Sequence, residues 1–408
     1  MFTIFILCAV LLLISIRQIG KFRLEIWQIM LGGAAAVLLA GEITPSEAIK
    51  AVDFDVIFFL FGMFVCGALF EISGYLAYNQ YRLFRNVDTA EKALFIFVFF
   101  CGISSAVVMN DTVAVIGVPV AVNLSKRFGI STKPLILALA FSITIGSVFS
   151  PIGNPQNLLI AISGSMSNPF LSFLKYLFLP TILNLLLLFL AIRAVYKNDF
   201  SAAALKHFYV PEKKKWLYFL SNLTMAIILA SIAAKIYFSL HGQQLRLTWI
   251  AVFACMPALL LSFQQVKILK NTDWKTLVFF AAMFVLMRAV WNCGFFQSLI
   301  EKGGFNILSI PFIFISALIL SQFVSNVPLV ALFLPLLSLK GGGDTQLLSL
   351  AAASTLAGNL SILGAASNVI VIQNVENRTG ETITFSEFVR MGVPLTAVNC
   401  FLCWLFLR

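Results

Sequence analysis

Ser150-Pro151-Ile152-Gly153-Asn154-Pro155-Gln156-Asn157 interrupts a long apolar run of the sequence. Two prolines, a glycine and three amide side chains cannot continue a helix, because proline lacks the N–H and its ring collides with the preceding turn. Inside a bilayer, the backbone groups released here must pair with protein, water or a ligand. The stretch therefore predicts a broken helix over 134–163, interrupted near the middle of a membrane.

The composition sets this stretch in a membrane protein. Of the 408 residues, 60% are hydrophobic and 11% charged, and the mean hydropathy is +0.98. A water-soluble chain of this length would expose far too much apolar surface. The net charge of +11 lies in short loops between apolar runs, as membrane topology requires, and argues against a nucleic-acid partner. The seven cysteines show no metal-ligand spacing beside histidine, so we expect no metal or cofactor.

A second interruption, Gly364-Ala365-Ala366-Ser367-Asn368, follows 211 residues later and predicts a second broken helix over 346–373. Paired interrupted helices in the two halves of a membrane chain point to a transporter's substrate site.

Two further apolar runs, 93–124 and 305–339, are too long for one crossing and carry polar residues in their middle. These are Met109-Asn110-Asp111-Thr112 in the first run and Ser325-Asn326-Val327-Pro328 in the second. Each run predicts a re-entrant hairpin with its tip near the middle of the membrane.

With both hairpins re-entrant, the sequence predicts an all-α polytopic membrane protein built from two repeats of five transmembrane helices. The first repeat is 1–194, a cytoplasmic linker is 195–215, and the second repeat is 216–408. Five crossings are an odd number, so the second repeat is inverted relative to the first. Segments 164–175 and 374–390 read as short interfacial helices.

The basic residues support this topology. With the N-terminus outside, twenty Lys and Arg residues fall inside, among them Arg17, Lys21 and Lys206, and seven fall outside. We therefore expect a multi-pass protein of the plasma membrane of a bacterium or archaeon, with both termini outside.

The two halves also share residues at nearly constant spacing. Matched pairs in the same order are Asp53 and Asp273, Gly74 and Gly294, Asn110 and Asn326, Ser150 and Ser361, Gly153 and Gly364, Asn157 and Asn368, and Pro180 and Pro394.

These motifs resemble the ion transporter superfamily. That group includes arsenite efflux pumps, NhaD-type sodium/proton antiporters, and citrate and divalent-anion:sodium symporters. The Asn-Asp tip at 110–111 and the Asn-x-Pro turn at 326–328 are most similar to the arsenite-pump branch. In the divalent-anion branch each tip would read Ser-Asn-Thr, from which both tips depart here.

Two tips and two breaks should bring four half-helix ends to one point. Half-helix N-termini favour an anion, whereas C-termini and unwound carbonyls favour a small cation such as sodium. Alternatively, the amides only satisfy the broken backbone. The candidate substrate- or ion-binding residues are Asn110, Asp111, Thr112, Ser150, Gly153, Asn154, Gln156, Asn157, Ser325, Asn326, Gly364, Ser367, Asn368 and Arg288.

Two of these residues carry charge. Asp111 at mid-membrane would cost about 3 kcal/mol or more unless paired, hydrated or protonated. It is a candidate proton carrier, a sodium ligand together with Asn110 and Asn326, or the partner of a buried cation; a shallow, solvated tip is the alternative. Arg288 has no basic counterpart in the first repeat, and it holds an anion, pairs with Asp111 or reaches outward to the interface.

The sequence thus predicts a secondary active transporter, not an enzyme, for a small anion or arsenite-like solute, coupled to a proton or sodium gradient. A sodium/proton antiporter is the alternative, and a channel is a weaker one because channels usually assemble repeats round one open pore. A membrane-embedded hydrolase lacks its motifs here. The expected partners are the solute and the bilayer, with a homodimer and a separate ATPase subunit left open.

Overall fold

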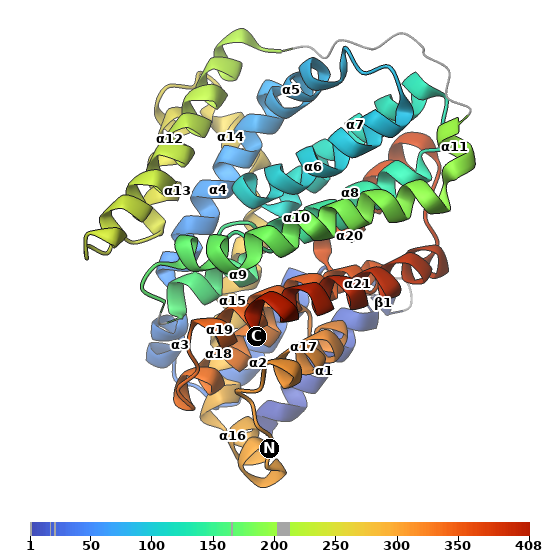
Figure 1. The fold of residues 1–408 in the computed structure, drawn as a ribbon. Helices are drawn as coiled ribbons and strands as arrows, with labels where there is room; N and C mark the ends of the chain where they lie inside the picture. The colour runs from blue at the N-terminus through green and yellow to red at the C-terminus, as the bar shows by residue number, and fades with distance from the viewer. Residues whose placement is uncertain (1, 17, 20–21, 165, 202–212) are drawn as a thin grey trace.

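The computed structural model describes residues 2–16, 18–19, 22–164, 166–201 and 213–408 (Figure 1). It is helical throughout, apart from the two-residue strands β1 (Gln18–Ile19) and β2 (Phe22–Arg23), which pair antiparallel. The all-α fold is therefore confirmed. Arg17, Lys21, Lys206 and residues 202–212 of the predicted linker lie outside the described residues.

The helices of the first half are α1 (Phe2–Ile16), α2 (Ile26–Leu39), α3 (Pro45–Ala51), α4 (Phe54–Ser73), α5 (Tyr75–Phe84), α6 (Ala90–Val108), α7 (Asn110–Phe128), α8 (Lys133–Ser147), α9 (Pro155–Ser163), α10 (Pro169–Val195) and α11 (Lys197–Ser201). Those of the second half are α12 (Lys215–Leu240), α13 (Thr248–Leu260), α14 (Gln265–Asn271), α15 (Trp274–Asn292), α16 (Phe295–Gly303), α17 (Ile310–Val324), α18 (Asn326–Leu339), α19 (Asp344–Leu356), the 3₁₀ turns η1 (Ala357–Asn359) and η2 (Ile362–Gly364), α20 (Ala366–Thr379) and α21 (Phe385–Leu407).

Six helices in the described part of the chain are long and apolar enough to cross a membrane, namely α4, α6, α10, α12, α15 and α21. Shorter apolar helices include α8, α17 and α18. Helix α8 ends at the first break, α17 ends at the second hairpin tip, and α18 begins at that tip. Whether the chain makes ten crossings in two inverted sets of five stays a prediction.

The local signals in the sequence explain several boundaries. Asp53 and Asp273 each cap the helix that follows, by accepting the N–H of Val56 and Thr276. Gly74 ends α4 in the left-handed region at φ 71°. Gly294 occupies the same region after α15, where glycine costs least.

The structure also corrects the sequence reading. The second break begins at Ala357 rather than at Gly364, so Ser367 and Asn368 belong to the first turn of α20. The interfacial helices expected at 164–175 and 374–390 are wrong: α10 takes up most of the first segment, and the second is divided between the end of α20, a short loop and the start of α21. Part of the linker is helical as α11.

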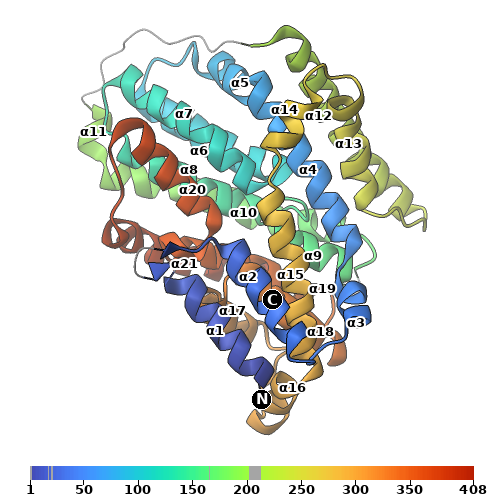
Figure 2. The same cartoon turned by 180° about the vertical axis from the view of Figure 1, so that it is seen from behind.

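The helices pack as two groups. The scaffold group is α1–α5 with α12–α16, in which α13 lies against α4 and α2 against α15. The core group is α6–α11 with α17–α21, in which α6 lies against α8 and α17 against α19. Figure 1 shows α12, α13 and α4 beside α6, α8 and α10, and Figure 2 shows α2 and α15 side by side. Fewer contacts join the two groups than join helices within each group.

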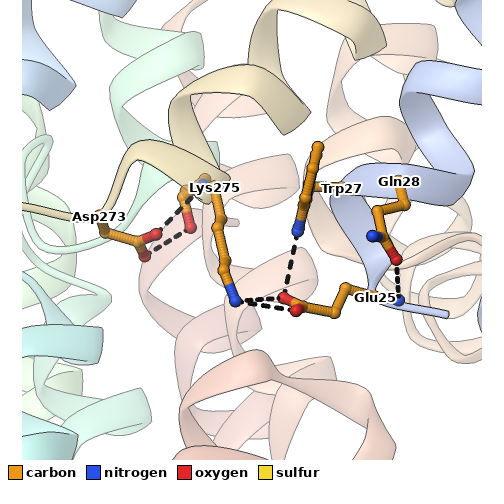
Figure 3. Close-up of polar contacts among 6 residues, drawn as sticks. Glu25, Trp27, Gln28, Asp273 and Lys275 are labelled. Carbon is orange, nitrogen blue, oxygen red and sulfur yellow. Dashed lines mark hydrogen bonds and ion pairs between the residues drawn. The ribbon is translucent and has the colours of Figure 1, made fainter. Parts of the chain in front are cut away.

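Two ion pairs join the first and second halves of the chain within the scaffold group. Glu25 precedes α2 and accepts hydrogen bonds at 2.7 and 2.8 Å from the Nζ of Lys275, at the start of α15 (Figure 3). In the second link, Asp55 at the start of α4 pairs with Arg246 at 3.6 Å and accepts the hydroxyl of Thr248 at 2.7 Å. The acid lies before α2 in one link and on α4 in the other.

Within the core group, backbone meets backbone at two glycines. A Cβ added at Gly146 of α8 would lie 2.0 Å from the carbonyl oxygen of Gly102 on α6. A Cβ added at Gly392 of α21 would lie 2.1 Å from the carbonyl oxygen of Asn359. Only glycine fits at these positions.

Candidate substrate-binding site

Both hairpins turn on a residue in the same strained backbone conformation. Met109, between α6 and α7, has φ 71° and ψ 142°. Ser325, between α17 and α18, has φ 69° and ψ 158°. Such angles cost a residue other than glycine about 1–3 kcal/mol and persist only where the surroundings enforce them. Each tip therefore presents an asparagine, Asn110 or Asn326, at the very start of a helix.

The first break is held open by Asn154. Its side-chain Oδ1 accepts the N–H of Asn157 at 2.9 Å, which caps α9. Its Nδ2 donates to the hydroxyls of Ser147 at 3.0 Å and Thr355 at 3.1 Å. Since Thr355 lies at the end of α19, Asn154 ties the two breaks together.

Asn157 and Asn368 satisfy the carbonyl groups that the breaks release. Nδ2 of Asn157 donates to the carbonyls of Ser147 and Ser150, both at 3.1 Å. Nδ2 of Asn368 donates to Gly358 at 2.7 Å and to Ser361 at 3.3 Å. The side-chain amides of these two residues therefore satisfy the broken backbone, which was the alternative to binding a ligand.

The first hairpin tip reaches both breaks. The N–H of Asn110 donates to the carbonyl of Gly153 at 2.9 Å, and its Nδ2 donates to the hydroxyl of Ser367 at 3.4 Å. The broken helix consists of α8 before Gly153 and the nine-residue α9 after it, so the hairpin tip contacts the broken helix between its two ends. Gly153 and Ser367 thus contact Asn110, and the N–H of Gly153 donates to the carbonyl of Ser150 at 3.3 Å.

The second tip occupies the related place. Nδ2 of Asn326 lies 3.6 Å from where a Cβ on Gly358 would be, and a Cβ on Gly364 would lie 3.0 Å from the Gly358 carbonyl. Gln156 donates to Thr355 at 3.5 Å. Helix α7 packs against α20, and α18 packs against α9, so each hairpin lies on the broken helix of the opposite half. Four helix N-termini, those of α7, α9, α18 and α20, therefore meet. We call the side chains gathered there the central cluster, namely Asn110, Asn154, Asn326, Ser367 and Asn368.

Three amide oxygens at the N-termini of α7, α18 and α20 accept no hydrogen bond from any described residue. They are Oδ1 of Asn110, Asn326 and Asn368, and all three side chains are buried. A buried acceptor without a partner costs about 1–3 kcal/mol. These oxygens are the groups in the cluster that a cation or a hydrogen-bond donor would satisfy.

Asp111 and Thr112 begin α7 and are half-buried. The hydroxyl of Thr112 lies 2.8 Å from where a Cβ on Gly67 of α4 would be, so this end of α7 touches the scaffold group. Asp111 forms no hydrogen bond or ion pair with a residue that the structure describes. It is adjacent in sequence to Asn110 and lies at the seam between the two groups.

The structure does not bring Arg288 to the cluster. Its side chain on α15 is exposed and makes no ion pair with Asp111. It lies toward α3, where the pKa of Glu47 falls below its usual range, chiefly because the Thr44 N–H and hydroxyl donate to that carboxylate and partly because of the Arg288 charge. Of the three roles considered for Arg288, this position matches the outward one.

Sequence reasoning missed several residues of the site. Thr355 links both breaks, and Gln322 donates to the carbonyl of Ala357 at 2.9 Å while accepting the hydroxyl of Ser361 at 3.0 Å. A buried threonine in an apolar helix looks unremarkable in a sequence. The available signal was Thr144, which lies 211 residues before Thr355 at the spacing of the paired breaks.

Two hairpin tips and two broken helices that converge inside a polytopic helical protein define a membrane transporter. Residues 9–338 match the citrate transporter family, and the chain belongs to that family. Membership of the ion transporter superfamily is thereby confirmed, whereas closeness to the arsenite-pump branch stays a prediction.

Relatives and a solved structure agree. The chain is 25% identical over 416 residues to an uncharacterized transporter of Mycobacterium bovis, covering 95% of this chain and 94% of that protein. It is 25% identical to the human P protein, covering 93% of this chain and 58% of that protein. The crystal structure of the Alcanivorax borkumensis YdaH transporter has the same fold, with a TM-score of 0.58, 14% identity, and coverage of 100% of this chain and 96% of that one.

Proposed function

We propose that this transporter moves a small anion, either an organic carboxylate or an arsenite-like solute, driven by a proton or sodium gradient. The observation that carries the proposal is the meeting of four helix N-termini at Asn110, Pro155, Asn326 and Ala366. Each helix N-terminus carries about half a positive charge, and the four together favour an anion. The description of the family as citrate transporters supports a carboxylate.

Coupling is assigned to Asp111. It is the carboxylate next to the tip, and it lies where the core group meets the scaffold group. A carboxylate there can carry a proton or, with the free oxygens of Asn110 and Asn326, bind a sodium ion. Binding either cation neutralises Asp111 and removes its repulsion of an anion at the helix N-termini.

The sodium/proton antiporter is the second candidate. It is favoured by the three amide oxygens without partners, which are neutral ligands for a hard cation. In that case the sodium ion is the substrate and Asp111 exchanges it for a proton.

Alternating access in this proposal is a movement of the core group along the scaffold group. The asparagines and serines of the candidate site all belong to the core group, which packs more closely within itself than against the scaffold group. The proposed location is the plasma membrane with both termini outside. The proposal needs neither a second copy of the chain nor an ATPase subunit.

Uptake by proteoliposomes tests the two candidates. With an imposed proton or sodium gradient, radiolabelled citrate, arsenite and sulfate are offered in turn, and internal pH is followed with a fluorescent dye. Gradient-dependent uptake of an anion supports the proposal. Sodium-dependent proton movement with no uptake of any anion would replace it with the antiporter.

A further inference from the structure

A polar cavity lies at the seam of the two groups, away from the central cluster. It has a volume of about 530 Å³ and is lined by residues that include Asp55, Gly164, Ser167, Lys235, Gln244 and Arg246. Gly164 and Ser167 follow α9 in the core group, whereas the other four belong to the scaffold group or its loops. The cavity is therefore walled by both groups.

Hydrogen bonds across the seam hold this region together. The hydroxyl of Ser163, the last residue of α9, donates to the Asp53 carboxylate at 3.2 Å. The hydroxyl of Ser239 on α12 donates to the carbonyl of Ser167 at 3.2 Å. Since α9 has nine residues, its central end lies about 13 Å from the cavity at 1.5 Å per residue. One short helix thus connects the cavity to the central cluster.

The cavity contains a buried cation, Lys235, that forms no ion pair with a described carboxylate. Lys235 is only 6% exposed, and its Nζ donates to a single described acceptor, the carbonyl of Leu245. A lysine ammonium has three donors. The lining carboxylate, Asp55, already pairs with Arg246 and accepts the hydroxyl of Thr248. Among the described lining residues the net charge is therefore positive, and two donors of Lys235 have no partner.

We infer that this cavity binds an oxyanion group, a carboxylate or a phosphate, with Lys235 as its main contact and Arg246 as a second cation at the rim. An oxyanion supplies both the charge and the acceptors that the buried ammonium lacks. The side chain of Arg246 is 75% exposed and so is free to turn toward a bound anion. A sodium ion is excluded by the same positive charge.

The cavity is the entrance for the transported anion, and this role rests on the proposed function. An anion held by Lys235 at the outer end of α9 has the N-terminus of that helix ahead of it, at the central cluster. Capture here raises the local concentration of substrate without contributing to the central site. Loss of Lys235 should therefore raise KM and spare kcat.

The test measures anion binding separately from transport. Gln244→Cys places a thiol at the cavity lining, in a background where the exposed Cys8 and half-buried Cys293 are replaced by serine. The rate of maleimide labelling is then measured in nanodiscs of neutral phosphatidylcholine, with citrate or inorganic phosphate added. Both faces are accessible in nanodiscs, so the result does not depend on topology.

We expect citrate or phosphate to slow the labelling, and Lys235→Met to raise the half-protecting concentration at least tenfold. Removing a buried charge from a membrane helix does not oppose insertion, so the Met variant should fold. Lys235→Arg keeps the charge and should stay within about threefold of the parent in that concentration. Lys50→Met, which removes an exposed lysine on α3, is the matched control and should leave protection unchanged.

The alternatives give different results. Protection only in discs that contain anionic phosphatidylglycerol would assign the site to a lipid headgroup and overturn the entrance role. An absence of protection in every condition would overturn the site itself. Wild-type KM for citrate uptake by Lys235→Met would remove the entrance role and leave the proposed function standing. Protection by citrate in a protein that transports no anion would contradict the proposed function and keep the site.

Discussion

Asn157 and Asn368, 211 positions apart, perform the same task in the two halves of the chain. Each donates its side-chain amide to carbonyls of its own break, and the acceptors match at the same spacing, Ser147 with Gly358 and Ser150 with Ser361. Asn157 also donates to the carbonyl of Val148 at 3.4 Å. The breaks are thus stable features of the fold that do not depend on a ligand for their backbone partners.

Asn157→Ala and Asn368→Ala should each destabilise the protein. Either change removes at least two hydrogen bonds to carbonyls of a break, at about 0.5–1.5 kcal/mol for each. We expect a clear fall in the apparent melting temperature in detergent. Asn374→Ala also removes an amide that donates to a carbonyl, but inside the intact helix α20, and it should be nearly neutral. Equal melting temperatures for all three variants would contradict the role.

Asp111→Asn should abolish coupled transport while the protein still inserts and folds, because the amide keeps the shape and cannot titrate. The measurement is gradient-driven uptake by proteoliposomes, with protein amount and monodispersity checked in parallel. Asp88→Asn changes an exposed carboxylate just before the same hairpin and serves as the control. Wild-type rates and unchanged coupling would remove Asp111 from the mechanism.

Arg288→Gln should change substrate affinity by less than about twofold, because the side chain is exposed and faces α3. Competition of unlabelled against labelled substrate gives the affinity directly. A tenfold loss, about 1.4 kcal/mol, would place Arg288 in the substrate path after all.

The link between Glu25 and Lys275 should give a pH-dependent contribution to stability. The hydrogen bond from Lys275 is the main reason why the pKa of Glu25 lies below its usual value of 4.5. A lowered pKa means that the contribution is present above pH 4.5 and is lost as the pH falls below it. Glu25→Gln should therefore lower the melting temperature at pH 7 more than at pH 3.5.

The control for this pair is Glu376→Gln, which removes an exposed carboxylate on α20 that forms no ion pair with a described residue. Exchanging the charges, with Glu25→Lys and Lys275→Glu together, should recover part of the loss. A pH-independent effect of Glu25→Gln would rule out the ion pair as its cause.

Cysteine accessibility in cells tests the inverted topology. Cysteines placed at 126–127 and 213–215 should be protected from an impermeant maleimide added outside, whereas those at 302 and 340 should react. Protection at 340 would mean that the second hairpin crosses completely, and the inverted arrangement would then fail.

The breaks and tips were predictable because helix-breaking residues carry a strong local signal. Pro151, Gly153 and Pro155 cannot continue a helix, and Asn110 and Asn326 stand out in apolar surroundings. The surface helices α5 and α16 were missed, although Gly74 and Gly294 mark their starts. Both are amphipathic and short, so an apolar-run search passes over them.

Other features depend on packing that no local pattern encodes. The direction in which Arg288 points is decided by how α15 sits against α2 and α3. The cavity around Lys235 joins a helix, two loops and the end of α9, so its charge balance appears only once the chain is folded. The exact start of the second break was also uncertain, since Gly358 and Asn359 fit a helix end as well as an interruption.

The contacts of Gly146 with Gly102 and of Gly392 with Asn359 have a consequence for solute affinity on the two sides of the membrane. No side chain separates the backbones there, so no change of rotamer can loosen them, and the hairpin, broken helix and last helix must travel as a single block. A rigid block offers a solute the same shape whichever compartment it faces. We therefore expect the solute to have nearly equal dissociation constants on the two sides of the membrane.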